Sequence, residues 1–218
     1  MKILLPLAVV GTLFLAQTAN ASLVLITDGT GYTGPVIDLS GYTGSYTFTQ
    51  GPLSLPGGVT YQAVGTDTQG GSVLGTGGYG LSSNGISVTT PIIGTNSGTG
   101  YVELAFDQVI TSFGGLFNYS PGSGGDNPFI AAYDAIGTLL GSFDLSALAP
   151  ISTPGGVDAF AFRGFESDSA DIASIRFGGS FLIYAAPSVA PVPVPAGLPL
   201  LLAALGGLGV VARRRKAS

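Results

Sequence analysis

The chain of 218 residues contains no cysteine, no histidine and no tryptophan, and only 9% of its residues are charged. Without cysteine, no disulfide bond can support the fold. Without histidine and cysteine, the Ser-His-Asp and Cys-His catalytic arrangements are impossible. Zinc sites almost always draw on the same two residue types, so no zinc site is expected. These absences predict a protein that is not an enzyme and that needs no cofactor.

Positive charge is scarce in the middle of the chain. Of the seven lysines and arginines, only Arg163 and Arg176 lie within residues 22–186. All twelve acidic residues lie there, so two basic against twelve acidic residues give this part a net charge of −10. Because binding to nucleic acid requires a basic surface, we expect no nucleic-acid partner.

The first 21 residues are typical of a secretory signal peptide. Lys2 supplies a positive charge, and residues 3–16 are almost wholly apolar. Ala19 and Ala21 place small residues at the two positions that a signal peptidase reads. We therefore predict a signal helix, cleavage after Ala21 and export. The alternative is an uncleaved N-terminal membrane helix.

Residues 192–218 contain a proline-rich motif, an uncharged apolar run and a basic cluster, in that order. The motif consists of Val192, Pro193, Val194, Pro195 and Ala196, the run of residues 197–212, and the cluster of Arg213, Arg214, Arg215 and Lys216. The run approaches the roughly 20 residues that a transmembrane helix needs. Lysine and arginine resist translocation, so the cluster would stay cytoplasmic. The alternatives are an ordinary membrane anchor and a buried helix of the main domain.

This order of segments resembles a PEP-CTERM sorting signal, and its motif is closest to the Val-Pro-Leu-Pro-Ala variant, with Val194 in place of leucine. The resemblance implies a Gram-negative bacterium and a membrane-embedded transpeptidase of the exosortase type that removes the tail. It also implies signal peptidase and exosortase as partners during export, and a transient stay in the inner membrane. The protein would then reach the cell surface, the outer envelope or the extracellular space, where exopolysaccharide or biofilm is made.

Residues 22–186 predict one all-β domain, because short runs of alternating or β-branched residues are separated by glycine-rich turns. The predicted strands are 22–27, 45–49, 60–64, 86–90, 101–106, 108–113, 115–119, 129–133, 138–145, 158–162, 172–177 and 179–184. Many short antiparallel strands of this kind indicate a β-sandwich. We also predict single helical turns at 144–149 and 167–170, a glycine-rich loop at 69–80 and a proline-rich linker at 187–195.

The second half of this domain carries motifs that strengthen the sandwich interpretation. They are residues 109–114, 131–134 with 137–143, 162–165 and 172–179. Together they are similar to β-sandwich ectodomains often found before such tails, which resemble galactose-binding-like jelly rolls. The resemblance implies a jelly-roll domain between the signal helix and the transmembrane helix.

Acidic side chains are the remaining candidates for chemistry. A pair of carboxylates can hydrolyse a glycosidic bond, and the candidates are Glu103, Asp107, Glu166 and Asp168. The simpler interpretation, which we favour, is that these carboxylates are solvated residues of strand ends and turns.

A calcium site is the second candidate, because calcium takes oxygen ligands from Asp, Asn and backbone carbonyl groups on loops. Asp126 and Asn127 lie in a glycine-rich loop, and Asp134 lies in the next predicted hairpin. The favoured alternative is that these residues form Asx turns.

Tyrosines beside glycine form the third candidate, a sugar-stacking surface. Gly31-Tyr32-Thr33-Gly34 is repeated as Gly41-Tyr42-Thr43-Gly44. The candidate sugar contacts are Tyr32, Tyr42, Tyr79 and Tyr119. The alternative is that these rings cover the ends of the domain. The sequence as a whole predicts an exported, non-catalytic cell-surface or matrix protein associated with exopolysaccharide. The alternatives are a carbohydrate-binding module and, third, a glycoside hydrolase.

Overall fold

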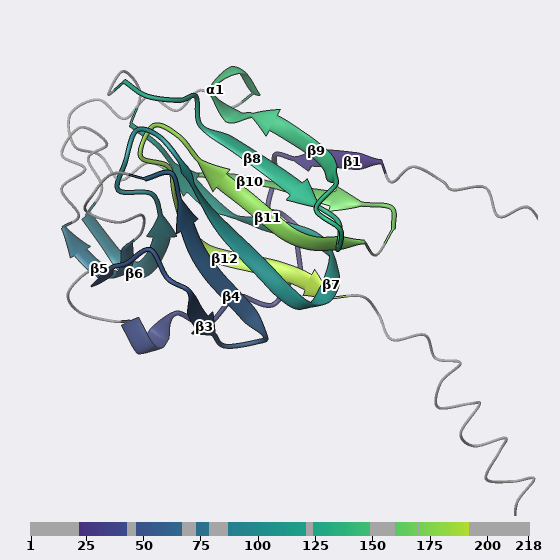
Figure 1. Cartoon of the computed structure of the whole chain (residues 1–218), viewed down its shortest axis with the longest axis horizontal. Helices are drawn as coiled ribbons and strands as arrows, with labels where there is room; N and C mark the ends of the chain where they lie inside the picture. The colour runs from purple at the N-terminus through teal and green to yellow at the C-terminus, as the bar shows by residue number, and fades with distance from the viewer. Residues whose placement is uncertain are drawn as a thin grey trace, which may run out of the picture.

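The computed structural model describes residues 22–42, 47–66, 73–78, 87–120, 124–148, 160–169 and 171–191. Within these residues the chain forms twelve strands, joined in one antiparallel hydrogen-bonded sheet (Figure 1). The strands are β1 Leu23–Ile26, β2 Thr47–Phe48, β3 Leu53–Leu55, β4 Val59–Val64, β5 Val73–Gly78, β6 Ser87–Gly94, β7 Tyr101–Asn118, β8 Phe129–Tyr133, β9 Leu139–Asp144, β10 Ala161–Ser167, β11 Ile172–Gly178 and β12 Ile183–Pro191. A 3₁₀ turn spans Ser40–Tyr42, and α1 is a single turn at Leu145–Leu148. The predicted all-β antiparallel class is confirmed.

The 18-residue strand β7 organises the sheet. Its first part pairs with β4 and β11, and its second part pairs with β10 and β12. One branch of the sheet is therefore β3-β4-β7-β11-β8-β9, and the other is β2-β5-β6-β12-β7-β10-β1. The last strands of the two branches meet where Leu23 of β1 packs on Gly141 of β9, so the sheet is barrel-like and nearly closed (Figure 1).

The prediction of three short strands within residues 101–119 is wrong. Asp107 and Gln108 are exposed at the point where β7 changes partners, and the strand continues through them. The backbone N–H of Asp107 donates to the carbonyl of Gly58 at 2.8 Å. Long-range pairing on both sides of β7 thus overrides the local turn signals of this stretch.

Further boundaries differ from the sequence-based prediction: β10 continues to Ser167 instead of ending at 162, and β12 begins at Ile183 instead of 179. Residues 73–78 of the predicted loop form β5, because β6 supplies ladder partners that glycine-rich residues do not predict locally. Within the predicted helical turn at 167–170, Ser167 ends β10 and the next two residues bend, so these three residues are not helical, and residue 170 lies outside the described residues. Residues 187–191 of the predicted linker belong to β12. Pro187 is tolerated there because the ladder with β7 is interrupted between Ala185 and Ser188.

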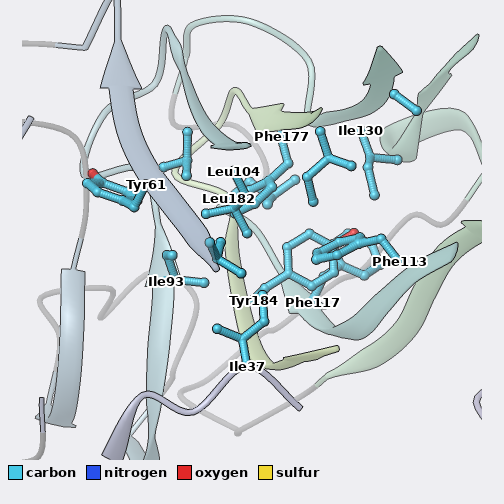
Figure 2. Close-up of a cluster of buried hydrophobic side chains, with 14 of the residues drawn as sticks. Ile37, Tyr61, Ile93, Leu104, Phe113, Phe117, Ile130, Phe177, Leu182 and Tyr184 are labelled. Carbon is cyan, nitrogen blue, oxygen red and sulfur yellow. The ribbon is translucent and has the colours of Figure 1, made fainter. Parts of the chain in front are cut away.

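The core lies between the two branches and is built from alternating residues of their strands. In β4, for example, Val59, Tyr61 and Ala63 are buried while the residues between them are exposed. At the centre, the ring of Tyr184 lies 5.1 Å from that of Phe113 and 5.0 Å from that of Phe177 (Figure 2). Because β11 and β12 belong to different branches, these rings join the two parts of the sheet.

In the part of the chain that the structure describes, no helix has the length and apolar character needed to cross a bilayer. The predicted signal peptide and the predicted transmembrane segment at 197–212 lie outside the described residues. The sandwich subtype and the two flanking helices therefore stay predictions.

Candidate functional site

A crossover segment, residues 28–34, forms one wall of the candidate site. It follows β1, which pairs with β10. The residues that follow the segment pair with β12. The N–H of Ile37 donates to the carbonyl of Pro187 at 2.7 Å, and the N–H of Val189 donates to the carbonyl of Pro35 at 3.0 Å. Because β10 and β7 separate β1 from β12 in the sheet, the segment must pass across these strands.

Strand register builds the floor under the crossover segment. Glu166 of β10, Ser112 of β7 and Ala190 of β12 are direct cross-strand partners. The neighbouring row contains Phe165 and Phe113, which face the core. Since successive side chains of a strand point to opposite faces, the row of Glu166 lies on the outer face.

A cleft of about 400 Å³ lies between this floor and the crossover segment, and we call it the Tyr32 cleft. Its lining combines one aromatic ring, two carboxylates and several hydroxyl groups. The lining residues are Ile26, Asp28, Thr30, Gly31, Tyr32, Thr33, Gly34, Thr111, Ser112, Glu166, Ser167 and Ala190.

Tyr32 is half-buried and held from several sides. Its ring lies 5.3 Å from that of Phe162. Its hydroxyl donates to the carbonyl of Ser188 and accepts from the Ser112 hydroxyl, both at 3.2 Å. Burial raises the pKa of Tyr32, and the negative charge of Glu166 adds to this rise. The phenol is therefore neutral at physiological pH and fixed in orientation.

The glycines of the first Gly-Tyr-Thr-Gly copy explain how this ring is seated. Gly31 has φ of +86°, a conformation that favours glycine. A Cβ on Gly34 would lie 2.8 Å from Cε1 of the Tyr32 ring, so only glycine allows the backbone to approach the ring this closely. Glycine also allows the backbone to approach the ring of Phe162, since a Cβ on Gly114 would lie 2.5 Å from Cζ of Phe162.

The cleft carries negative charge. A carboxylate oxygen of Asp28 accepts the N–H of Thr30 at 2.9 Å, and this hydrogen bond lowers the pKa of Asp28. Glu166 is exposed, and its carboxylate makes no hydrogen bond with the described residues. Neither Arg163 nor Arg176 lines the cleft. The site can therefore offer hydrogen-bond acceptors and hydroxyl groups beside an aromatic ring.

The three predicted sugar contacts that the structure describes do not line one cleft. Tyr32 lines the cleft, whereas Tyr42 packs against the core and its N–H donates to the carbonyl of Leu39. Tyr119 is 5% exposed and stacks on Phe117, so its predicted role as a surface sugar contact is wrong. Tyr79 lies outside the described residues.

The predicted calcium ligands are separated. The amide of Asn127 donates to Asp144 at 2.8 Å, and the N–H of Asp126 donates to the carbonyl of Gly98. Asp134 lies beyond the other end of β8, and a five-residue strand spans roughly 17 Å. Its carboxylate accepts the N–H groups of Ile136 and Thr138, as in an Asx turn. Among the described residues, no three acidic side chains come together to hold a metal ion.

The predicted catalytic carboxylates are also dispersed. Glu103 forms an ion pair with Arg176, whose guanidinium lies between the rings of Tyr101 and Tyr133. Asp168 accepts the N–H of Ser22 at 3.0 Å, and Asp107 is exposed on β7. Only Glu166 of the four lines the Tyr32 cleft.

Sequence reasoning missed Asp28 and Ser112 as members of the site. No local pattern could have found Ser112, because only the register of β7 with β10 and β12 brings it beside Glu166 and Tyr32. Asp28 could have been found from Asp28-Gly29-Thr30, a turn pattern directly before the first repeat copy. The processing residues 192–196 and 213–216, with Ala19 and Ala21, lie outside the described residues. No protein-family model, curated protein or solved structure matches this chain.

Proposed function

We propose that the chain is an exported, non-catalytic protein of the cell surface or extracellular matrix that binds carbohydrate in the Tyr32 cleft. One observation carries the binding: the cleft places the Tyr32 ring beside the hydroxyl of Ser112 and the carboxylates of Asp28 and Glu166. A sugar offers an apolar ring face and a rim of hydroxyl groups. Recognition sites for such ligands combine an apolar surface with a few placed polar groups.

The acids of the cleft favour binding over glycoside hydrolysis. Hydrolysis needs one carboxylic acid with a raised pKa to protonate the leaving group. The hydrogen bond from Thr30 instead lowers the pKa of Asp28. The pair therefore suits a role as acceptors for sugar hydroxyl groups.

The proposed export rests on the two ends of the chain. The apolar segment after Lys2 and the Ala19/Ala21 site support a signal peptide, and residues 192–218 support a PEP-CTERM-like sorting signal. We further propose that the β domain is a jelly-roll sandwich between a signal helix and a transmembrane helix. Signal peptidase and an exosortase would process it, and the ligand would be the cell's own exopolysaccharide.

A pair of variants at one position tests the binding. We expect Tyr32→Ala to weaken binding to purified exopolysaccharide about tenfold, because the stacking ring is lost. Tyr32→Phe keeps the ring and should retain most of the affinity. Binding is measured by pull-down and calorimetry on the full-length chain, in a detergent without a sugar headgroup. Equal binding by the wild type and Tyr32→Ala, or release of new reducing ends, would contradict the proposal.

Export is tested separately by cell fractionation and intact-mass measurement. The expected surface form begins at Ser22 and lacks the C-terminal basic cluster. A full-length chain recovered unprocessed from the cell interior would contradict this part.

A further inference from the structure

We infer that the Tyr32 cleft selects glycans that carry free amino groups over N-acetylated and anionic glycans. This inference rests on the proposed function, since it names the class of sugar that the same cleft takes. It begins from the charge of the lining, which holds the carboxylates of Asp28 and Glu166 and no cationic side chain.

The two arginines of the β domain, Arg163 and Arg176, interact with groups that do not line the cleft. Nη1 of Arg163 donates to the carbonyl groups of Thr27 and Phe162. Arg176 pairs with Glu103 on the other branch of the sheet. No cation is therefore available in the cleft to neutralise a carboxylate or sulfate on a ligand, so an anionic glycan would meet like charge.

Glu166 is the acid that is free to contact a ligand. Asp28 already accepts the N–H of Thr30, whereas the Glu166 carboxylate has no hydrogen-bond partner among the described residues. It lies beside Ser112 on the floor, close enough to Tyr32 to influence its pKa. A sugar stacked on the Tyr32 ring would therefore present its substituents to Glu166.

An ammonium group matches this arrangement better than a hydroxyl or an acetamide. All three can donate to the Glu166 carboxylate, but only the ammonium group brings three N–H donors and adds the Coulomb attraction of a positive charge. An acetamide has one N–H and no charge. The difference should be modest, because an exposed charge pair contributes about 1 kcal/mol or less, which is about fivefold in affinity.

Calorimetry on the full-length chain with three oligosaccharides of equal length tests the inference. The ligands are β-1,4-linked oligomers of glucosamine and of N-acetylglucosamine and an α-1,4-linked oligomer of galacturonate, at a pH that keeps the amine protonated. We expect the glucosamine oligomer to bind about fivefold more tightly than the N-acetylated one, and the galacturonate oligomer not to bind. The preference should shrink as salt is raised.

Two charge-removing variants separate a local contact from general attraction to an acidic domain. Glu166→Gln should abolish the fivefold preference, because it weakens binding of the glucosamine oligomer more than binding of the N-acetylated oligomer. Asp107→Asn removes one charge outside the cleft, on an exposed position of β7, and should change neither affinity. An equal loss in both variants would overturn the inference, because attraction would then come from net charge alone.

The remaining outcomes are also decisive. Equal affinity for the glucosamine and N-acetylated oligomers would overturn the selectivity while the proposed carbohydrate binding stands. Loss of glucosamine binding on addition of EDTA would overturn it too, since the acids would then act through a metal ion. If none of the oligomers and no exopolysaccharide binds, the proposed function itself fails.

Discussion

Replacing Tyr184 by phenylalanine is expected to stabilise the protein. Tyr184 is fully buried, and its hydroxyl has no hydrogen-bond partner among the described residues. Its ring packs against Phe113 and Phe177, and phenylalanine would keep these contacts. The substitution therefore removes a polar atom that loses its hydration on folding and gains no hydrogen bond from the described residues.

The expected magnitude follows from the cost of burying an unpaired polar group, about 1–3 kcal/mol. We expect the free energy of unfolding of Tyr184→Phe to rise by about 1 kcal/mol, at the lower end of that range. The matched control is Tyr61→Phe. Tyr61 is equally buried, but its hydroxyl donates to the carbonyl of Thr49 at 2.9 Å. Tyr61→Phe removes this hydrogen bond, so its free energy of unfolding should be lower than that of the wild type by about 1 kcal/mol.

The same pair predicts a difference at alkaline pH. Burial raises the pKa of Tyr184 above that of the unfolded chain, which is about 10. The neutral form is favoured in the folded state, so this contribution is fully present below pH 10 and is lost as pH rises further. Tyr184→Phe should therefore lose less stability than the wild type above about pH 10.

Urea unfolding followed by tyrosine fluorescence measures both effects, because the chain contains nine tyrosines and no tryptophan. The measurements are made at pH 7 and above pH 10 on the wild type and both variants. If Tyr184→Phe were destabilised as much as Tyr61→Phe, the hydroxyl of Tyr184 would have to be hydrogen-bonded. That result would refute the reasoning, and so would an unchanged loss of stability at alkaline pH.

Two other substitutions test the packing and the turns. Gly164→Ala should cost about 2 kcal/mol in urea unfolding, because its Cβ would lie too close to the carbonyl oxygen of Phe113 on the paired strand. Gly41→Ala, where a Cβ meets open space, should be near neutral, and equal losses would contradict the packing argument. Asp134→Ala should lower Tm at pH 7, because the carboxylate accepts the N–H of Thr138. This hydrogen bond lowers the pKa of Asp134, so the Tm difference should be full above about pH 4 and shrink as pH falls further, through the lowered pKa; a difference that does not shrink with falling pH would contradict it.

Much of the strand content could be predicted from the sequence, because alternation is a local property. The prediction of residues 129–133 coincides with β8, and that of 60–64 lies within β4. The glycine-rich strand β5 and the continuity of β7 through Asp107 and Gly114 could not be predicted. Their residues are weak strand formers or contain turn signals, and partners distant in the sequence stabilise them.

The candidate site was predicted only in fragments. Tyr32 and Glu166 were each named, but for different chemistries and without any reason to lie together. Asp28 and Ser112 were not named. The cleft exists because residues 28–34 cross the strands that carry Glu166 and Ser112, and the sequence separation between these parts hides that contact.

Composition and local pattern set the chemistry that the chain can offer: no cysteine or histidine, an acidic middle part, short alternating strands and two ends that predict export. These properties depend only on residue counts or on patterns of neighbouring residues, so the sequence is enough to establish them. The tertiary structure alone decided that β7 is shared by both branches, that Tyr119 is buried and that Tyr32 faces Glu166 across one cleft. Strand register and crossover decide such contacts, and both depend on pairing between residues that are distant in the sequence.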